Sequence, residues 1–252
     1  MKKLTMLDYV KETPDVLRTN IEQYTTLVDP LMKEVQQKEI KRILLVASGS
    51  SHNACYCARS FVEKVSGLEV RIITPYTFTY YENDIKETDL VLVVTQSGLS
   101  TNAIEALKII KKKQCRAICL TGNKNSDVKD VADVVIEYGV GEELVGYVTK
   151  GVSSLALFLD LFAIAYSGKT EYLEELKKAV HLNEEMIDQA TNFIQRHYKN
   201  FTSMSWVYSC GAGANYGTAL ESALKMGETI HIPSCCYEIE EYIHGPNLQL
   251  TP

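Results

Sequence analysis

The chain has 252 residues, 46% of them hydrophobic, so it can bury a sizeable core in one large or two smaller domains. Its formal net charge of −6 argues against a general nucleic-acid binder, because contact with a phosphate backbone needs a concentrated basic face. The densest basic cluster, residues 111–113, falls at the end of a predicted helix, where lysines suit the helix dipole.

Neither the N-terminal segment nor the longest apolar run suggests a membrane protein. The start, MKKLTMLDYV, is basic but has no sustained apolar segment, so we expect no signal peptide. The longest apolar run, residues 155–166, contains Asp160 and is too short to span a bilayer. We therefore expect a cytoplasmic protein with no membrane contact. The seven cysteines lack zinc-ligand spacing, so we expect no metal site and mostly buried, reduced thiols.

The first two thirds of the chain read as helices followed by alternating strands and helices. Residues 5–37 have apolar positions at helical spacing and predict one or two amphipathic helices. Segment 77–82 is short and aromatic and is left unassigned. Alternation predicts an α/β fold with a doubly wound parallel sheet and a ligand at the carboxyl ends of its strands. Strands are expected at residues 43–46, 68–73, 89–95, 116–120 and 133–136.

The last third of the chain repeats the pattern of residues 42–65, in which a strand, a Gly- and Ser-containing turn and a helix follow one another. An apolar helix at 153–166 and a long helix at 171–198 lead to a strand at 205–209 and a helix at 215–229. Gly49 matches Gly211 and Asn53 matches Asn215 at one offset, which predicts two tandem α/β units. That offset would put the second copy of the segment after the 89–95 strand beyond residue 252, so we expect a truncated second unit.

Hydroxyl side chains gather after two of the predicted strands. Backbone N–H groups and hydroxyls at a helix N-terminus can bind a phosphate without a lysine, because the helix dipole supplies positive potential. Each serine could instead be an N-cap, and Ser100 is a fair candidate for that role. Two such turns in one unit favour a phosphate site, and no nucleotide-binding lysine or dinucleotide fingerprint is present. The residues concerned are Ser48, Ser50, Ser51, Thr95, Ser97 and Ser100.

A second group of polar residues lies on the 215–229 helix. Glu221, Lys225 and Glu228 follow one another at steps of four and three and share one helical face. The plain interpretation is a surface salt-bridge ladder. The alternative is a carboxylate base that moves protons on a sugar together with His244, whose imidazole the following Gly245 and Pro246 would hold in place.

These segments resemble the sugar isomerase (SIS) family. TQSGLST (residues 95–101) resembles the SQSGET-type phosphate loop, and ASGSSHN (residues 47–53) resembles the CGTSYN-type turn. ALESALKMGETIHIPSCCYEIEEYIHGP (residues 219–246) resembles a stretch of the isomerase half of glucosamine-6-phosphate synthase. The resemblance implies a flavodoxin-like fold and three regions: N-terminal helices at 1–36, a first SIS unit at 37–168, and a linker helix with the start of a second unit at 169–252.

The resemblance also implies roles for individual residues. Glu228 would be the base at C1/C2, Lys225 an active-site lysine, and His244 an acid that commonly arrives from a neighbouring subunit. We therefore expect a homodimer or higher homo-oligomer with shared sites, and no metal or organic cofactor. Val148 stands where the family commonly has a serine, so the match of 147–150 is partial. The implied phosphate ligands are Ser51, Thr95, Gln96, Ser97 and Ser100, with Ser50 beside them.

The residues leave several activities open. The chain resembles stand-alone enzymes that act on amino-linked sugar 6-phosphates, the fructosamine-6-phosphate deglycases and glucosamine-6-phosphate deaminases. An aldose–ketose isomerase needs the same base and phosphate site. A non-catalytic phosphosugar sensor is the alternative from another class, although the N-terminal helices show no basic recognition helix.

Overall fold

The computed structural model describes residues 4–36 and 38–250. A five-stranded, wholly parallel sheet forms the larger part, with strand order β2-β1-β3-β4-β5, and a separate two-stranded parallel sheet pairs β6 with β7. The order 2-1-3-4-5 is that of flavodoxin-like sheets, which confirms the predicted α/β class. The strands are β1 (Arg42–Ala47), β2 (Glu69–Ile73), β3 (Asp89–Thr95), β4 (Ile118–Thr121), β5 (Val134–Glu137), β6 (Val207–Gly211) and β7 (Ser234–Glu238).

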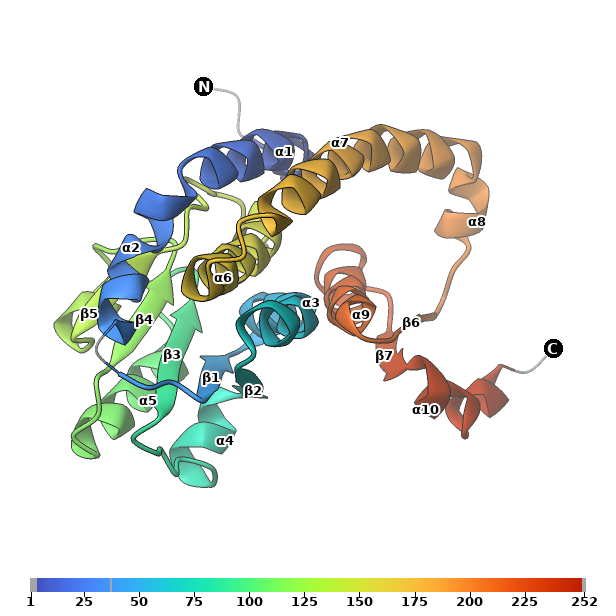
Figure 1. The fold of residues 1–252 in the computed structure, drawn as a ribbon. Coiled ribbons are helices and arrows are strands. Elements are labelled where there is room, and N and C mark those ends of the chain that lie inside the picture. The colour runs from blue at the N-terminus through green and yellow to red at the C-terminus, as the bar shows by residue number, and fades with distance from the viewer. Residues whose placement is uncertain (1–3, 37, 251–252) are drawn as a thin grey trace.

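Helices cover both faces of the larger sheet (Figure 1). Side chains of β3 alternate between two cores, with Leu92 facing α3 and α6 and Val93 facing α4 and α5. The helices are α1 (Met6–Glu22), α2 (Tyr24–Val35), α3 (Gly49–Ser66), α4 (Pro75–Tyr80), α5 (Thr101–Lys112), α6 (Lys150–Ser167), α7 (Tyr172–Arg196), α8 (Tyr198–Thr202), α9 (Ala214–Lys225) and α10 (Ile239–Ile243). Short 3₁₀ turns lie at Asp127–Asp130 and Pro246–Gln249, and a π-helical turn, η2, at Met226–Ile230.

Helix α6 is the most apolar helix of the fold. Within the described residues it alone is long and apolar enough to cross a membrane by length and composition, with a mean hydropathy of 1.3. Yet 61% of that window is buried, against α3, α1 and α2. It is therefore the central packing helix of the first unit.

Helix α3 joins the two parts of the chain. It packs against α6 on one side and α9 on the other, as Figure 1 shows. Gly217 of α9 allows the close approach, because a Cβ there would lie 2.5 Å from the main-chain nitrogen of Cys57 and 2.8 Å from the main-chain oxygen of Asn53. Helix α9 is thus docked directly on the helix that follows β1.

The structure assigns two segments for which the sequence predicts no element, 77–82 and β7, and it corrects two expectations, the 215–229 helix and the burial of the thiols. Segment 77–82 belongs largely to α4, whose N-cap Thr74 accepts a hydrogen bond from the Thr77 N–H. The predicted 215–229 helix ends as an α-helix at Lys225 and continues as the π-helical turn. Strand β7 was not expected. The thiols are not mostly buried: all seven cysteines are free, but only Cys55 and Cys119 are buried.

Candidate active site

A cavity of about 1010 Å³ opens at the carboxyl ends of the strands. Strands β1 and β3 are neighbours in the sheet, and their chains leave in opposite directions toward α3 and α5. Ligands of open α/β sheets bind at such a switch point. The cavity brings the two hydroxyl turns together, as the sequence predicts, and it is lined by Ser48, Ser50, Ser51, Thr95, Gln96, Ser97 and Ser100 among others.

The turn after β3 is held by hydrogen bonds among its own side chains. The Thr95 hydroxyl donates to Ser100 Oγ at 3.1 Å, and the Leu99 N–H donates to Ser97 Oγ at 3.2 Å. Ser100 occupies the N-cap position of α5 but makes no side-chain cap bond. Gly98 has φ = 66°, and a Cβ there would lie 1.7 Å from Ser126 Oγ. Only glycine therefore fits this turn.

The turn after β1 connects to the turn after β3 across the cavity. The Asn102 side chain of α5 donates to Ser48 Oγ at 3.1 Å. Ser50 and Ser51 lie in the first turn of α3 and are buried, at 6% and 8% exposure. Two helix N-termini, those of α3 and α5, thus face one cavity, and together they favour an anion there.

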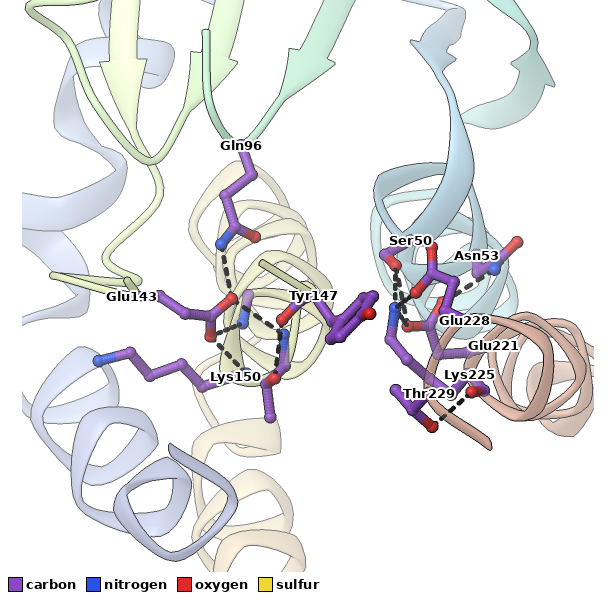
Figure 2. Close-up of polar contacts among 12 residues, drawn as sticks. Ser50, Asn53, Gln96, Glu143, Tyr147, Lys150, Glu221, Lys225, Glu228 and Thr229 are labelled. Carbon is purple, nitrogen blue, oxygen red and sulfur yellow. Dashed lines mark hydrogen bonds and ion pairs between the residues drawn. The ribbon is translucent and has the colours of Figure 1, made fainter. Parts of the chain in front are cut away.

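Glu221, Lys225 and Glu228 form a network with α3 rather than a ladder exposed to solvent (Figure 2). The Lys225 ammonium lies 3.0 Å from Glu221 Oε1 and 2.7 Å from Glu228 Oε2, and it donates to Ser50 Oγ at 2.9 Å. Glu221 also accepts from the Asn53 side chain at 2.8 Å. The Lys225 and Glu221 side chains are only 15% and 14% exposed.

Ser50 is the point where this network meets the cavity. Ser50 lines the cavity, and its hydroxyl donates to Glu221 Oε1 at 2.9 Å and accepts from Lys225. Glu228 lies at the centre of the π-helical turn, a geometry that is frequent at functional sites. Glu228 is not among the residues that line the cavity, but Lys225 connects its carboxylate to Ser50, which is.

The structure does not bring His244 to this network. His244 follows α10, is exposed, and is not among the residues that line the cavity. Among the described residues, no hydrogen bond or ion pair joins it to Glu228. Residues 147–150 lie at the start of α6, where the Lys150 side chain is only 1% exposed and pairs with Glu12 at 3.0 Å.

The side chain of Gln96 has other partners than the phosphate that the sequence predicts, and one of them is Glu143. The Gln96 side chain, expected on a phosphate, donates to Glu143 Oε1 at 2.8 Å and accepts from the Tyr138 hydroxyl at 3.1 Å. Glu143 and Tyr138 were not singled out by the sequence, since neither belongs to a periodic pattern or a motif. Asn53 could have been found, because the internal repeat matches it with Asn215.

Comparisons with known proteins agree with this fold. The SIS domain model matches residues 38–165. The glutamine–fructose-6-phosphate aminotransferase of Clostridium perfringens is 26% identical over 255 residues, covering 96% of this chain and 42% of that protein. The enzyme of the same name from Shouchella clausii is 28% identical over 253 residues, covering 95% and 42%. The chain thus spans about two fifths of the length of these curated relatives.

Solved structures are similar over nearly the whole chain. A Clostridium difficile protein proposed to be a phosphosugar isomerase superposes with a TM-score of 0.87 at 27% identity, covering 97% of this chain and 72% of that one. The C-terminal domain of glucosamine-fructose-6-phosphate aminotransferase from Francisella tularensis gives 0.82 at 23% identity, covering 98% and 73%, and supports the fold alone. With a family match over half of its length and this agreement in fold, the chain belongs to the SIS domain family.

Proposed function

We propose that this chain binds a sugar 6-phosphate and catalyses its isomerisation or a related reaction, in which Glu228 moves a proton between C1 and C2. The observation that carries the proposal is Ser50, a residue of the cavity lining whose hydroxyl bonds to both Glu221 and Lys225. It joins a phosphate site to a candidate base in one continuous set of hydrogen bonds.

The phosphate would lie between the two hydroxyl turns. Ser51, Thr95, Ser97 and Ser100 supply hydroxyls there, and the N-termini of α3 and α5 supply N–H groups and positive potential. Gln96 would contribute through the shape of its turn, since its side-chain amide is bonded to Glu143 and Tyr138.

Proton transfer would use the Glu228 carboxylate. In the open-chain sugar the carbonyl acidifies the neighbouring C–H, so a carboxylate can remove that proton and return it to the adjacent carbon. Lys225 would orient Glu228 through their 2.7 Å ion pair and would stabilise the oxygen that gains charge in the enediolate.

An amine-bearing substrate is the finer form of the proposal. The described residues that line the cavity include Glu137, Glu142 and Glu143 and no lysine or arginine. These carboxylates would attract the positive charge of an amino group, while the N-termini of α3 and α5 attract the phosphate. The glucosamine-6-phosphate deaminase of Thermotoga maritima has a similar fold, with a TM-score of 0.77 at 22% identity over 95% of this chain and 74% of that one.

His244 would act as the acid at the site of a second copy of the chain. Its exposed position after α10 leaves the imidazole available to a neighbour. A protonated imidazole can give its proton to a ring oxygen or a departing amine and become neutral, since imidazole exchanges protons near neutral pH.

The test is an NMR time course in deuterated water with fructose 6-phosphate, glucosamine 6-phosphate and fructosamine 6-phosphate. Deuterium incorporation at C1 or C2, absent in Glu228→Gln, is the expected result. Release of ammonia or an amine would identify the amino-sugar reaction, and interconversion without release a plain isomerase. Binding of these sugars without turnover would overturn the enzymatic proposal in favour of a sensor.

A further inference from the structure

The Glu143 carboxylate lies where three segments of the first unit meet (Figure 2). Its Oε1 accepts hydrogen bonds from Gln96 Nε2 at 2.8 Å and from the Thr149 N–H at 2.9 Å. Its Oε2 accepts from the N–H groups of Lys150 at 2.7 Å and Gly151 at 3.4 Å. One side chain of the 139–149 loop therefore ties the end of β3 to the first turn of α6.

Gln96 is held by several contacts in this arrangement, although it also lines the cavity. The Tyr138 hydroxyl donates to its side-chain oxygen at 3.1 Å, which leaves the amide nitrogen directed at Glu143. A Cβ at Gly151 would lie 1.7 Å from Gln96 Oε1, so the amide rests directly on the helix backbone. The main-chain oxygen of Gln96 accepts from Gly122 N at 3.0 Å. The direction in which the chain enters the turn at residues 97–100 is thus fixed by contacts of Gln96.

The charge of Glu143 has a second effect. Helix α6 has 18 residues, and its first N–H groups attract an anion. Glu143 supplies that anion from within the chain. The N-terminus of α6 is therefore neutralised, and only the N-termini of α3 and α5 remain to attract a phosphate in the cavity.

We propose that Glu143 is a positioning residue for the phosphate-binding turn: by holding Gln96 against the N-terminus of α6, it sets the shape of residues 97–100 before a ligand arrives. The proposal rests on the proposed function only for the identity of the ligand, a sugar phosphate. The contacts of Glu143 with Gln96 and the first turn of α6 are present in the free protein, whatever the ligand.

The experiment compares amide hydrogen exchange in the ligand-free wild-type protein and the Glu143→Ala variant. Exchange should become about tenfold faster in peptides that span residues 96–104, 121–128 and 149–152, the scale expected for loss of hydrogen bonds to a charged group. Peptides of α2 and α7 should not change. Glu34→Ala is the matched control, because Glu34 accepts two hydrogen bonds from Arg116 but lies on α2, outside the cavity lining.

Two further measurements sharpen the test. Sodium formate should restore slow exchange in Glu143→Ala, since formate can occupy the vacated carboxylate position, whereas sodium chloride at equal ionic strength should not. Glu143→Gln, which keeps the size and one acceptor oxygen, should give an intermediate exchange rate and serves if the alanine variant does not fold.

Measurement of ligand affinity then tests whether the shape of the turn matters for binding of a sugar phosphate. The dissociation constant of fructose 6-phosphate, measured by calorimetry, should rise about tenfold in Glu143→Ala and remain unchanged in Glu34→Ala. Equal exchange in the wild type and Glu143→Ala at all three peptides would overturn the positioning role. If the wild type binds no sugar phosphate, the proposed function fails, while the exchange comparison still decides the role of Glu143.

Discussion

The Ser50 hydroxyl donates a 2.9 Å hydrogen bond to Glu221, a residue 171 positions later in the chain. This bond connects the first turn of α3 to α9. Lys225 of α9 also donates to Ser50, so a single residue of the cavity lining separates Lys225 from the cavity. Because both groups are largely buried, the bond is screened little by solvent. It makes the candidate base and the proposed phosphate site parts of one hydrogen-bonded network.

Glu221→Ala should destabilise the protein by about 2–3 kcal/mol, because Ser50, Asn53 and Lys225 would lose a shared acceptor in a partly buried site. Urea unfolding measures the loss. Glu105→Ala, which removes an exposed carboxylate paired with Lys108, is the control and should change stability by no more than about 0.5 kcal/mol. Equal losses in the two variants would contradict the structural role of Glu221.

Glu228→Gln should lower turnover of the sugar phosphate by about 10²- to 10⁴-fold, the range for loss of a general base, while substrate binding persists. Deuterium exchange at C1/C2 and calorimetry measure the two effects separately. Glu185→Gln, an exposed carboxylate on α7, should leave both unchanged. A variant at Glu228 with normal exchange would exclude this residue as the base.

His244→Ala should abolish turnover, and mixing it with Glu228→Gln should restore part of it. If two copies share their sites, random dimers contain half mixed pairs with one intact site each, so roughly a quarter of the wild-type rate should return. The assay requires unfolding and refolding the two variants together. Failure of the mixture to recover activity, with both variants folded and associated, would contradict the shared site.

Gly217→Ala should destabilise the packing of α9 on α3 by about 1–3 kcal/mol, because the added methyl would meet the backbone of Cys57 and Asn53. Thermal unfolding followed by circular dichroism measures this. Gly227→Ala is the matched control, since the nearest atom to its Cβ, Ser234 Oγ, lies 3.9 Å away. A similar melting temperature for Gly217→Ala and the wild type would show that the helices can separate without cost.

The Arg42–Asp89 ion pair should make stability depend on acid pH. Burial of the Asp89 carboxyl raises its pKa, but hydrogen bonds from Arg42 and the Lys86 N–H outweigh this, so the pKa lies below its ordinary value of 3.8. A lowered folded-state pKa adds stability above pH 3.8 that is lost as the pH falls through the folded value. Asp89→Asn should therefore be less stable than the wild type at pH 7, and this difference should shrink below pH 3.8. A difference independent of pH would rule out the ionised pair as its source.

The sequence predicts the layers of the fold well but not the elements that depend on distant partners. Strand β3 is found at its predicted bounds, because a run of five apolar residues, 90–94, leaves little choice. Helix α6 begins three residues before its expected start, at Lys150, because Glu143 accepts the N–H groups of its first turn. Strand β7 follows Pro233 and has no apolar alternation, and its pairing with β6 defines it.

The candidate site shows the same division. The hydroxyl turns could be placed together, since parallel strands end at one edge of the sheet. The partners of Gln96 and Ser50 could not be predicted. Glu143 lies in a loop and Glu221 on a helix, and no local sequence pattern indicates which distant side chains these carboxylates contact.

The packing of helix α3 predicts how the protein responds to a single proteolytic cut. It is packed by α6 on one side and by α9 on the other, and neither contact depends on the peptide link between them. A protease that cuts once within residues 203–206, between α8 and β6, would break the chain but not the Ser50–Glu221 bond or the fit at Gly217. The nicked protein should run as one species in native electrophoresis and as two fragments only after denaturation.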